Sequence, residues 1–338
     1  MKKICVCSVQ VPFVRGGAEF LAESLVLELK RREYQVDLIQ LPLSTEPLEE
    51  VVKSALAWRL TDLFRADLVI ATKFPSYMIP HRNKKIWLVH QLRGAYNLYG
   101  TVYSGFANTP RDHRLREQLI EMDQLAFAEA QQIFSISKTV ATRLKHYNGF
   151  DSTPLYPPLS DVSKFHYRST DTFVLSVSRL EPDKRVRLLI DAMQHVPPAY
   201  RAIIVGDGTQ LHDCERLVSR SGLQDRIRLT GTIPREEVID LYSRAGVVFY
   251  GPIDEDYGFS TIEAFASKKP VITCADSGGI LEFVDENTGW IVPPEPEKIG
   301  EAITKALRDQ EAARARGEAG FARISSLNWD SVIDALTS

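Results

Sequence analysis

The sequence predicts an α/β protein built from two doubly wound units, each a parallel sheet with helices on both faces. Short apolar segments rich in Val, Ile and Leu alternate with amphipathic helical segments along the whole chain. Strands that are apolar throughout are typical of parallel sheets that are covered on both faces. The length of 338 residues suits two domains better than one, because a single hydrophobic core rarely grows that large.

The first half opens with a strand at KICVCSV, although MKKICVCSVQVPF begins like a signal peptide. The apolar run ends at Pro12 and lacks a long Leu/Ala-rich core, so we interpret it as a strand. A helix follows at residues 18–32, with Leu21, Leu25 and Leu29 on one face. Further strands are expected at QVDLIQL, ADLVIAT, KIWLVH and QIFSIS, with helices at RLREQLIEMDQLAFAEA and KTVATRLKHY.

The alternation pauses over residues 151–171, which contain three prolines and few periodic residues. We place the interdomain linker there. Strands then resume at TFVLSVS, AIIVG, RIRLTG, GVVFYG and PVITCA. The expected domains are residues 1–160 and 161–325. A final helix over 326–338 should return to the first domain, because an apolar stripe formed by Trp329, Val332, Ile333 and Leu336 follows a long charged stretch.

The composition limits the class of protein. Apolar residues make up 44% of the chain and charged residues 25%, which excludes disordered, collagen-like and coiled-coil chains. No segment reaches the ~20 apolar residues that a membrane-spanning helix needs. Four cysteines without metal-ligand spacing predict a cytoplasmic protein. Residues 1–165 hold 21 Lys and Arg against 17 Asp and Glu, a net charge of +4 that suits an anionic partner or surface, or reflects scattered solvated charges.

Three loop segments contain residues suited to binding a phosphate or sugar. Ligands of doubly wound sheets bind beyond the carboxyl ends of the strands. Gly16 and Gly17 lie between the first strand and the first helix, where the backbone can approach a ligand or simply turn. Arg179 and Lys184 follow the first strand of the second half, and two such cations could hold a diphosphate or remain solvated. We expect the ligand site in the cleft between the two doubly wound units, and His90, which ends the strand KIWLVH, either faces that cleft or is structural.

The segment DEDYGFSTIEAFASKKPVI is the most informative, because Glu255 and Glu263 are separated by seven residues. Glu255 follows a strand, and Glu263 lies in the first turn of the next helix. The backbone amides of Phe259, Ser260 and Thr261 would face an anion at that helix N-terminus. An alternative for Glu263 is a capping box with Ser260.

Asp254-Glu255-Asp256 also forms a D-x-D pattern, which binds a divalent metal with a nucleotide sugar in a different glycosyltransferase fold. We do not favour that interpretation, because the architecture differs and a cationic pair is available for a diphosphate. Gly278 and Gly279 form another glycine turn that either meets a ligand or is a plain turn.

Together and in this order, these segments resemble glycosyltransferase family 4, retaining enzymes of the GT-B fold. The likeness covers GGAEFLAESLVLELKRREYQVDL, SVSRLEPDKRVRLLIDAM, IVGDGTQ, the E-x7-E segment and SGGILEFVDENTGWIVPP. The resemblance implies that Arg179 and Lys184 bind the donor diphosphate. It also implies that Glu255 contacts the sugar hydroxyls, that Glu263 contacts the ribose, and that the amides of residues 259–261 meet the distal phosphate or sugar.

The resemblance further implies that Gly17 approaches the donor or acceptor and that His90 lies beside the transferred sugar. Asp256-Tyr257 and Ser260 depart from the commoner residues of the family but keep the acidic pair. The implied function is transfer of a hexose from a GDP- or UDP-linked sugar to a hydroxyl of a saccharide or glycolipid. No metal or other cofactor and no nucleic acid are expected. The alternatives are a GT-B nucleotide-sugar epimerase and a non-catalytic sugar-binding protein.

The acceptor is expected to meet the segment from Leu92 to Glu117, which is aromatic and basic. Tyr96 and Tyr99 could stack on sugars and Arg93 could meet an anionic lipid diphosphate, unless the segment is an ordinary surface loop. SALAWRLTDLFR, at residues 54–65, carries four large apolar residues at helical spacing: Leu56, Leu60, Leu63 and Phe64. We expect them to pack into the core, and an interfacial membrane helix is the alternative. Peripheral membrane contact through the basic first domain is also possible.

Overall fold

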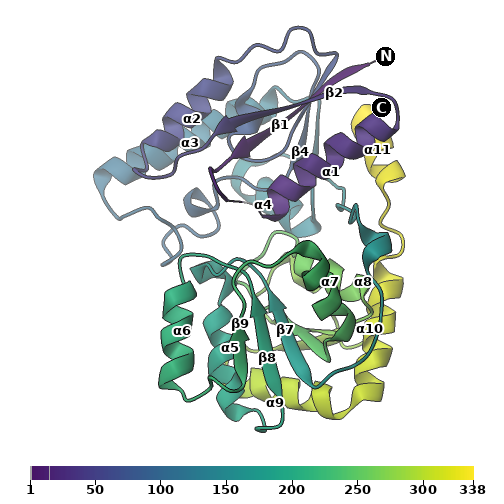
Figure 1. Cartoon of the computed structure of the whole chain (residues 1–338). Coiled ribbons are helices and arrows are strands. Elements are labelled where there is room, and N and C mark those ends of the chain that lie inside the picture. The colour runs from purple at the N-terminus through teal and green to yellow at the C-terminus, as the bar shows by residue number, and fades with distance from the viewer. Residues whose placement is uncertain (1, 15) are drawn as a thin grey trace. The chain divides into compact units, whose positions relative to one another are not determined.

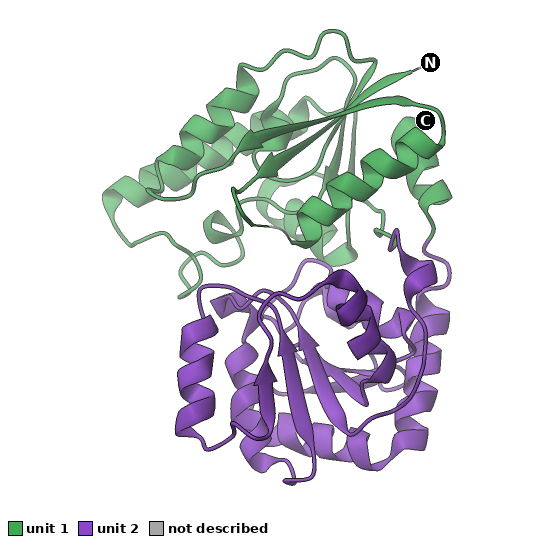
Figure 2. Cartoon of the chain, viewed as in Figure 1, with its two compact units in different colours: residues 1–158, 328–338 green, residues 159–327 purple. Residues whose placement is uncertain are grey.

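Two six-stranded sheets, both parallel throughout, organise the computed structural model of this chain, which describes residues 2–14 and 16–338 (Figure 1). The chain divides into two compact units, residues 1–158 with 328–338 and residues 159–327 (Figure 2). Helices connect the strands in both units, as continuous apolar strands between helical segments predict. The predicted fold class, two doubly wound parallel sheets, is confirmed.

In unit 1 the strand order is β2-β1-β3-β4-β5-β6. The order reverses between β1 and β3, so the loops after these two strands flank the topological switch point. The elements are β1 (Lys3–Gln10), α1 (Gly17–Arg31), β2 (Gln35–Pro42), α2 (Glu50–Arg59), β3 (Leu68–Ala71), η1 (Ser76–Met78), β4 (Lys84–Leu88), η2 (Arg93–Ala95), α3 (Pro110–Ala128), β5 (Gln132–Ser135), α4 (Lys138–Asn148), β6 (Thr153–Pro154) and α11 (Trp329–Thr337).

The final helix, α11, packs in unit 1 beside α1 (Figure 1). Its apolar stripe is buried, and the Trp329 ring meets Trp87 of β4 edge to face, with 6.1 Å between ring centroids. Lys85 of β4 donates to the backbone oxygens of Ala335 and Ser338 at 3.2 and 2.7 Å, near the carboxyl end of the helix. A lysine there also matches the negative end of the helix dipole.

In unit 2 the strand order is β12-β11-β10-β7-β8-β9, with the switch point between β7 and β10. Apolar residues of both sheet faces and of the flanking helices form its core. The elements are η3 (Val162–Lys164), β7 (Phe173–Val177), η4 (Pro182–Lys184), α5 (Val186–Ala192), η5 (Met193–His195), β8 (Arg201–Val205), α6 (Leu211–Arg220), β9 (Ile227–Leu229), α7 (Arg235–Arg244), β10 (Val247–Phe249), α8 (Phe259–Ala266), β11 (Val271–Cys274), η6 (Gly279–Glu282), β12 (Gly289–Val292), α9 (Pro296–Arg308) and α10 (Gln310–Ile324).

The structure corrects two expectations about segments. Residues 151–171 are not all linker, because Thr153–Pro154 pairs with β5 as the edge strand of the first sheet, a position that tolerates proline. The four apolar residues at 54–65 do not all enter the core. Leu56, Leu60 and Phe64 are 47%, 84% and 70% exposed, and the helix already ends at Arg59. Within residues 2–14 and 16–338, no helix has the length and apolar character to span a bilayer.

Candidate functional site

The switch point of unit 2 brings together two of the predicted site residues. The loop after β7 leads into η4, which contains Lys184, and the loop after β10 contains Glu255. The Lys184 ammonium lies 2.6 Å from Glu255 Oε2 and 3.3 Å from a carboxylate oxygen of Asp183. The side chains of Lys184 and Glu255 are only 10% and 13% exposed, so this is a largely buried ion pair between loops 71 residues apart.

Opposing effects act on the charge of Lys184. Burial of the ammonium opposes its charge, but Glu255, Tyr250 and Asp183 outweigh that penalty and raise its pKa. Burial raises the pKa of the Tyr250 hydroxyl, as does the negative charge of Glu255, while Lys184 and Arg179 act in the other direction. Lys184 is therefore a permanent cation, and this loop cluster concentrates charge of both signs beyond the carboxyl ends of β7 and β10.

Backbone contacts hold the loop that contains Glu255 against the loop after β11. The amide of Asp254 donates to Asp276 O at 2.8 Å, the amide of Glu255 donates to Ser277 O at 3.2 Å, and that of Gly279 donates to Glu255 O at 2.8 Å. Gly278 has φ +61°, and a Cβ there would lie 2.6 Å from Glu255 O. Gly278 and Gly279 therefore allow the two loops to pack, and the backbone they approach is that of residues 254–256.

Arg185 was not identified from the sequence, and its side chain holds the loop after β10 in place. Its guanidinium forms two hydrogen bonds with the Asp276 carboxylate at 2.6 and 2.7 Å and donates to the carbonyls of Gly251 and Pro252 at 2.9 Å. A planar fork of donors suits such a set of acceptors. The basic run DKRVR shows that cations follow β7, but a partner 91 residues away gives no local signal.

Arg179 follows β7 and is exposed. Among the described residues its side chain forms no hydrogen bond or ion pair. The adjacent loop after β8 approaches very closely, since a Cβ on Gly206 would lie 1.8 Å from Ser178 O. Glycine is therefore required in the segment GDG for the loops after β7 and β8 to meet.

The first turn of α8 differs from the predicted capping box. Gly258, with φ +87°, is the N-cap residue, and no side chain caps the helix. Ser260 donates its hydroxyl to Val177 O of β7 at 2.7 Å, so it ties the helix to the strand and does not cap it. The Thr261 amide donates to Gly258 O at 2.9 Å. In the part of the chain that the structure describes, the buried Thr261 hydroxyl has no hydrogen-bond partner.

Glu263 does not meet Glu255 but pairs with Arg235 of α7. The Arg235 guanidinium lies 2.7 Å from Glu263 Oε1 and also contacts Asp161 at 3.1 Å. Burial raises the pKa of Glu263, although Arg235 and the hydroxyl of Tyr242 work against that rise. The predicted contact of Glu263 with a ribose stays a prediction, and Arg235 fixes where that carboxylate lies.

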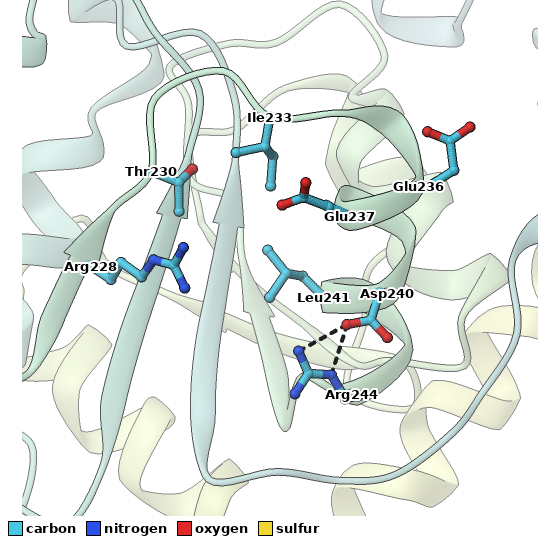
Figure 3. Close-up of a pocket in the computed structure, with 8 residues that line it drawn as sticks. All are labelled: Arg228, Thr230, Ile233, Glu236, Glu237, Asp240, Leu241 and Arg244. Atoms are coloured by element: carbon cyan, nitrogen blue, oxygen red, sulfur yellow. Dashed lines mark hydrogen bonds and ion pairs between the residues drawn. The ribbon is translucent and has the colours of Figure 1, made fainter.

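A hollow of about 330 Å³ lies along α7 and the edge strand β9 (Figure 3). Glu237 and Leu241 of α7 point toward Thr230 and Ile233, while Arg244 is paired with Asp240 (Figure 3). None of the predicted site residues lines this hollow. It therefore adds no chemistry to the site at the switch point.

In unit 1, Gly17 begins α1 at the switch point of the first sheet. Gly16 is the N-cap residue, and its amide donates to Glu19 Oε2 at 2.8 Å. Glu19 also accepts from Lys73, which follows β3, at 2.6 Å, and both side chains are 10% exposed. Burial raises the pKa of Glu19, but Lys73 and the backbone amides of Glu19 and Gly16 outweigh it and lower that pKa. The glycine turn is thus held against the loop after β3.

His90 lies two residues beyond β4, which ends at Leu88 and not at the histidine as predicted. Its Nδ1 is 2.7 Å from Gln91 O. A carbonyl can only accept, so Nδ1 carries a proton and the lone pair of the neutral imidazole lies on Nε2. That tautomer presents Nε2 as the acceptor of the ring.

The three residues predicted to meet the acceptor differ in how far they are buried and in what they contact. Tyr96 is buried, and its hydroxyl donates to Asp123 of α3 at 2.5 Å, so its ring is not exposed for stacking on a sugar. This corrects that part of the prediction. Tyr99 is half-buried, with its hydroxyl 2.8 Å from His113 Nδ1 and the Arg116 guanidinium 4.1 Å from the centre of its ring. Arg93 is half-buried in η2.

Asp123 should make the stability of the protein depend on pH. Burial raises the pKa of this carboxyl to about 7, although hydrogen bonds from Tyr96 and Tyr77 lower it. Between about pH 4 and pH 7 the folded state therefore binds a proton that the unfolded state releases, and stability falls as the pH rises through this window. In urea unfolding, we expect the free energy of unfolding of Asp123→Asn to rise by about 1 kcal/mol per pH unit relative to that of wild type between pH 5 and pH 7. A constant difference across that range would contradict this prediction.

Within residues 2–14 and 16–338, no three His, Cys, Asp or Glu side chains are grouped so that they could hold a metal ion. Asp256 is buried and Asp254 has φ +43°. The metal independence expected from the sequence stays a prediction.

Comparisons with known proteins show which family and which relatives this chain is similar to. Residues 161–323 match the family described as glycosyl transferases group 1. D-inositol 3-phosphate glycosyltransferase of Mycobacteroides abscessus is 27% identical over 223 residues, which are 62% of this chain and 49% of that protein. The chain thus matches about half the length of this relative.

Two solved structures show the fold. Anabaena Alr3699/HepE in complex with UDP and glucose has a TM-score of 0.73 at 17% identity and covers 100% of this chain and 98% of its own. Sucrose-phosphate synthase from Thermosynechococcus elongatus has a TM-score of 0.76 at 20% identity with the same coverage. The predicted GT-B fold is confirmed, and residues 161–323 of the chain match the family model described as glycosyl transferases group 1.

Proposed function

We propose that this protein is a retaining glycosyltransferase that moves a hexose from a UDP- or GDP-linked sugar to a hydroxyl of a saccharide or glycolipid acceptor. The observation that carries the proposal is the buried Lys184–Glu255 pair at the switch point of a domain of the glycosyl transferases group 1 family. HepE, which shares the fold, was solved with UDP and glucose, and this supports a nucleotide-sugar donor.

The leaving diphosphate gains negative charge as its bond to the sugar breaks, and fixed cations stabilise that charge where it develops. An ammonium has three N–H donors, and Glu255 and Asp183 contact two of them, so Lys184 can offer the third to a phosphate oxygen. Arg179 is exposed at the same edge and adds a fork of donors. The amides of Phe259 and Ser260 at the start of α8 complete the anion contact.

Glu255 orients the sugar and stabilises the positive charge that the anomeric carbon develops. Its carboxylate lies 2.6 Å from the Lys184 ammonium in a largely buried place, so the two charges oppose each other directly. For retention, the acceptor attacks from the face that the phosphate leaves, and a phosphate oxygen accepts the proton of the acceptor. This route needs no carboxylate nucleophile of the kind that retaining glycosidases use. In the first unit, His90 lies beside the transferred sugar and segment 92–117 meets the acceptor.

The central test has two arms. In thermal-shift measurements, UDP or GDP at 100 times its dissociation constant should add about 2.7 kcal/mol, a rise of roughly 5–10 °C in melting temperature. UDP-glucose or GDP-mannose should then release nucleotide faster when D-inositol 3-phosphate or octyl β-D-glucopyranoside is added. Retention is read from the anomeric configuration of the product by NMR. Formation of an epimer from donor alone would favour the epimerase, and binding without any turnover would favour a silent sugar-binding protein.

Turnover should not require a divalent metal. Lys184, Arg179 and the α8 amides supply the positive charge that a metal ion would otherwise bring to the diphosphate. We expect nucleotide release in 5 mM EDTA to stay within about twofold of the untreated rate. Abolished turnover that Mg²⁺ or Mn²⁺ restores would instead assign Asp254 and Asp256 to a metal site.

We further propose that the protein works in the cytoplasm, in contact with the inner face of a membrane. The exposed side chains of Leu56, Leu60 and Phe64 support this, with the Arg65 guanidinium 5.5 Å from the centre of the Phe64 ring. Burying one such side chain in a bilayer contributes about 1.5–3 kcal/mol.

The paired substitution Leu60→Glu with Phe64→Glu should therefore lower binding to phosphatidylglycerol vesicles at least 10-fold in a flotation assay. Phe321→Glu is the matched control, because Phe321 is an exposed apolar residue of the other unit. Equal binding by the paired variant and wild type would remove this surface from the proposal.

A further inference from the structure

A buried carboxylate in unit 1 has contacts that the proposed chemistry does not use. Asp123 of α3 is 1% exposed. It accepts hydrogen bonds from the hydroxyls of Tyr77 at 2.9 Å and Tyr96 at 2.5 Å. Among the described residues, no Lys, Arg or His forms an ion pair with it. A buried carboxylate without a counter-charge costs stability, and an apolar residue of the same shape often stabilises a fold more.

The hydrogen bonds of Asp123 continue through a chain of buried side chains. Tyr96 also accepts from the Asn148 side chain at 3.3 Å, and Asn148 in turn accepts from the side chain of Gln91. Gln91 and Asn148 are 3% and 6% exposed. The chain therefore runs from α3, through the last residue of α4, to the residue next to His90.

Two members of this chain, Tyr96 and Gln91, lie on one segment, residues 90–99. His90 Nδ1 contacts the carbonyl of Gln91, so the position of the Gln91 peptide sets the orientation of the imidazole. Arg116, two turns before Asp123 on α3, donates to Ala95 O at 2.7 Å and lies over the Tyr99 ring. The segment contains His90, Arg93 and Tyr99, which are proposed to meet the transferred sugar and the acceptor.

We propose that Asp123 is a positioning residue that fixes segment 90–99, and through Tyr96, Asn148 and Gln91 the imidazole of His90, for the transfer step. This inference rests on the proposed function for its consequence in catalysis. Its structural content, the dependence of segment 90–99 on the Asp123–Tyr96 contact, can be measured in the protein without any substrate.

Four variants separate positioning from support of the fold. Asp123→Leu removes the polar contacts but fills the same space, and Asp123→Asn keeps an acceptor and a donor at the same place. Tyr96→Phe removes only the hydroxyl that links Asp123 to the segment. Tyr77→Phe is the matched control, because it removes the other hydroxyl on the same carboxylate, from η1, outside the segment.

Hydrogen exchange of the apo protein is the first readout. Asp123→Leu and Tyr96→Phe should raise the exchange rates of the amides in 91–99 at least 10-fold, while Tyr77→Phe changes them less than threefold. Because Asp123→Leu leaves the buried hydroxyls of Tyr77 and Tyr96 without an acceptor, it should unfold at a lower urea concentration than Asp123→Asn, which keeps one. Unchanged exchange in Asp123→Leu and Tyr96→Phe, or equal effects of Tyr77→Phe and Tyr96→Phe, would overturn the proposal.

Kinetics with UDP-glucose and octyl β-D-glucopyranoside are the second readout. Asp123→Leu and Tyr96→Phe should lower kcat/KM for the acceptor about 10-fold, with the donor KM within twofold of wild type and with Asp123→Asn restoring most of the loss. Loss of turnover in proportion to loss of stability across all four variants would overturn the proposal. A wild type that binds neither UDP nor GDP would instead count against the proposed function, and the exchange measurement would still decide the positioning.

Discussion

Glu255→Ala is expected to turn over at least 100-fold more slowly than wild type, with only a small change in the donor KM. The carboxylate acts on charge that appears at the sugar only as its bond to the phosphate breaks, so its removal lowers kcat and leaves ground-state binding in place. Lys184→Ala should behave alike, since the charge of the leaving diphosphate also develops in the transition state, where one lost electrostatic contact costs about 10²- to 10³-fold. Steady-state kinetics with varied donor measure both effects.

The contact between the two side chains sharpens this prediction. Because Lys184 and Glu255 lie 2.6 Å apart in a largely buried place, each single substitution also strands the charge of the other. The double variant should therefore lose less than the product of the two single losses. Lys298→Ala is the matched control, since Lys298 forms an exposed ion pair with Glu301 on α9. If Glu255→Ala turned over at nearly the wild-type rate, the assignment of the reacting centre to Lys184 and Glu255 would be wrong.

The fold could be predicted because its signal is local. Alternating apolar and amphipathic segments fix which residues form strands, and parallel topology places the loops after β7 and β10 at one edge of a sheet. The closeness of Lys184 and Glu255 follows from that topology. Their direct ion pair does not, because it depends on the paths of two loops that Arg185 and Asp276 hold together.

The errors have a common physical cause. Sequence patterns place a residue on a segment, but the side that it faces is set by contacts with other segments. Tyr96 is aromatic and lies in a polar loop, yet Asp123 draws its hydroxyl inward. Ser260 has the spacing of a capping residue, yet it bonds to Val177 of a strand 83 residues away. Leu60 has helical spacing from Leu56, yet α2 ends one residue before it.

The pair formed by Glu263 and Arg235 should show a large asymmetry in stability. The Glu263 side chain is 11% exposed, whereas Arg235 is 35% exposed and keeps Asp161 as a second partner. Arg235→Ala leaves a buried carboxylate without its counter-charge, which costs about 3–5 kcal/mol. Glu263→Ala leaves the Arg235 guanidinium solvated by water and paired with Asp161, so a loss of about 1 kcal/mol of stability is expected. The predicted capping role of Glu263 would have added a separate loss, but the N-cap residue is Gly258 and no side chain caps the helix.

Urea unfolding of the two variants and of Arg235→Ala with Glu263→Gln tests this asymmetry. The neutral amide removes the stranded charge, so the double variant should recover most of the stability that Arg235→Ala loses. The deficit of Arg235→Ala should also shrink as the pH falls, because burial already raises the pKa of Glu263 and protonation then removes the charge within the folded state. In the same set, Glu263→Gln should raise the donor KM more than it lowers kcat, as expected of a contact to the ribose that is equal in ground and transition states. If Arg235→Ala and Glu263→Ala lost equal stability at every pH, other groups besides Arg235 would have to hold the Glu263 carboxylate. The ion pair with Arg235 would then not explain how that carboxylate is placed to meet the donor.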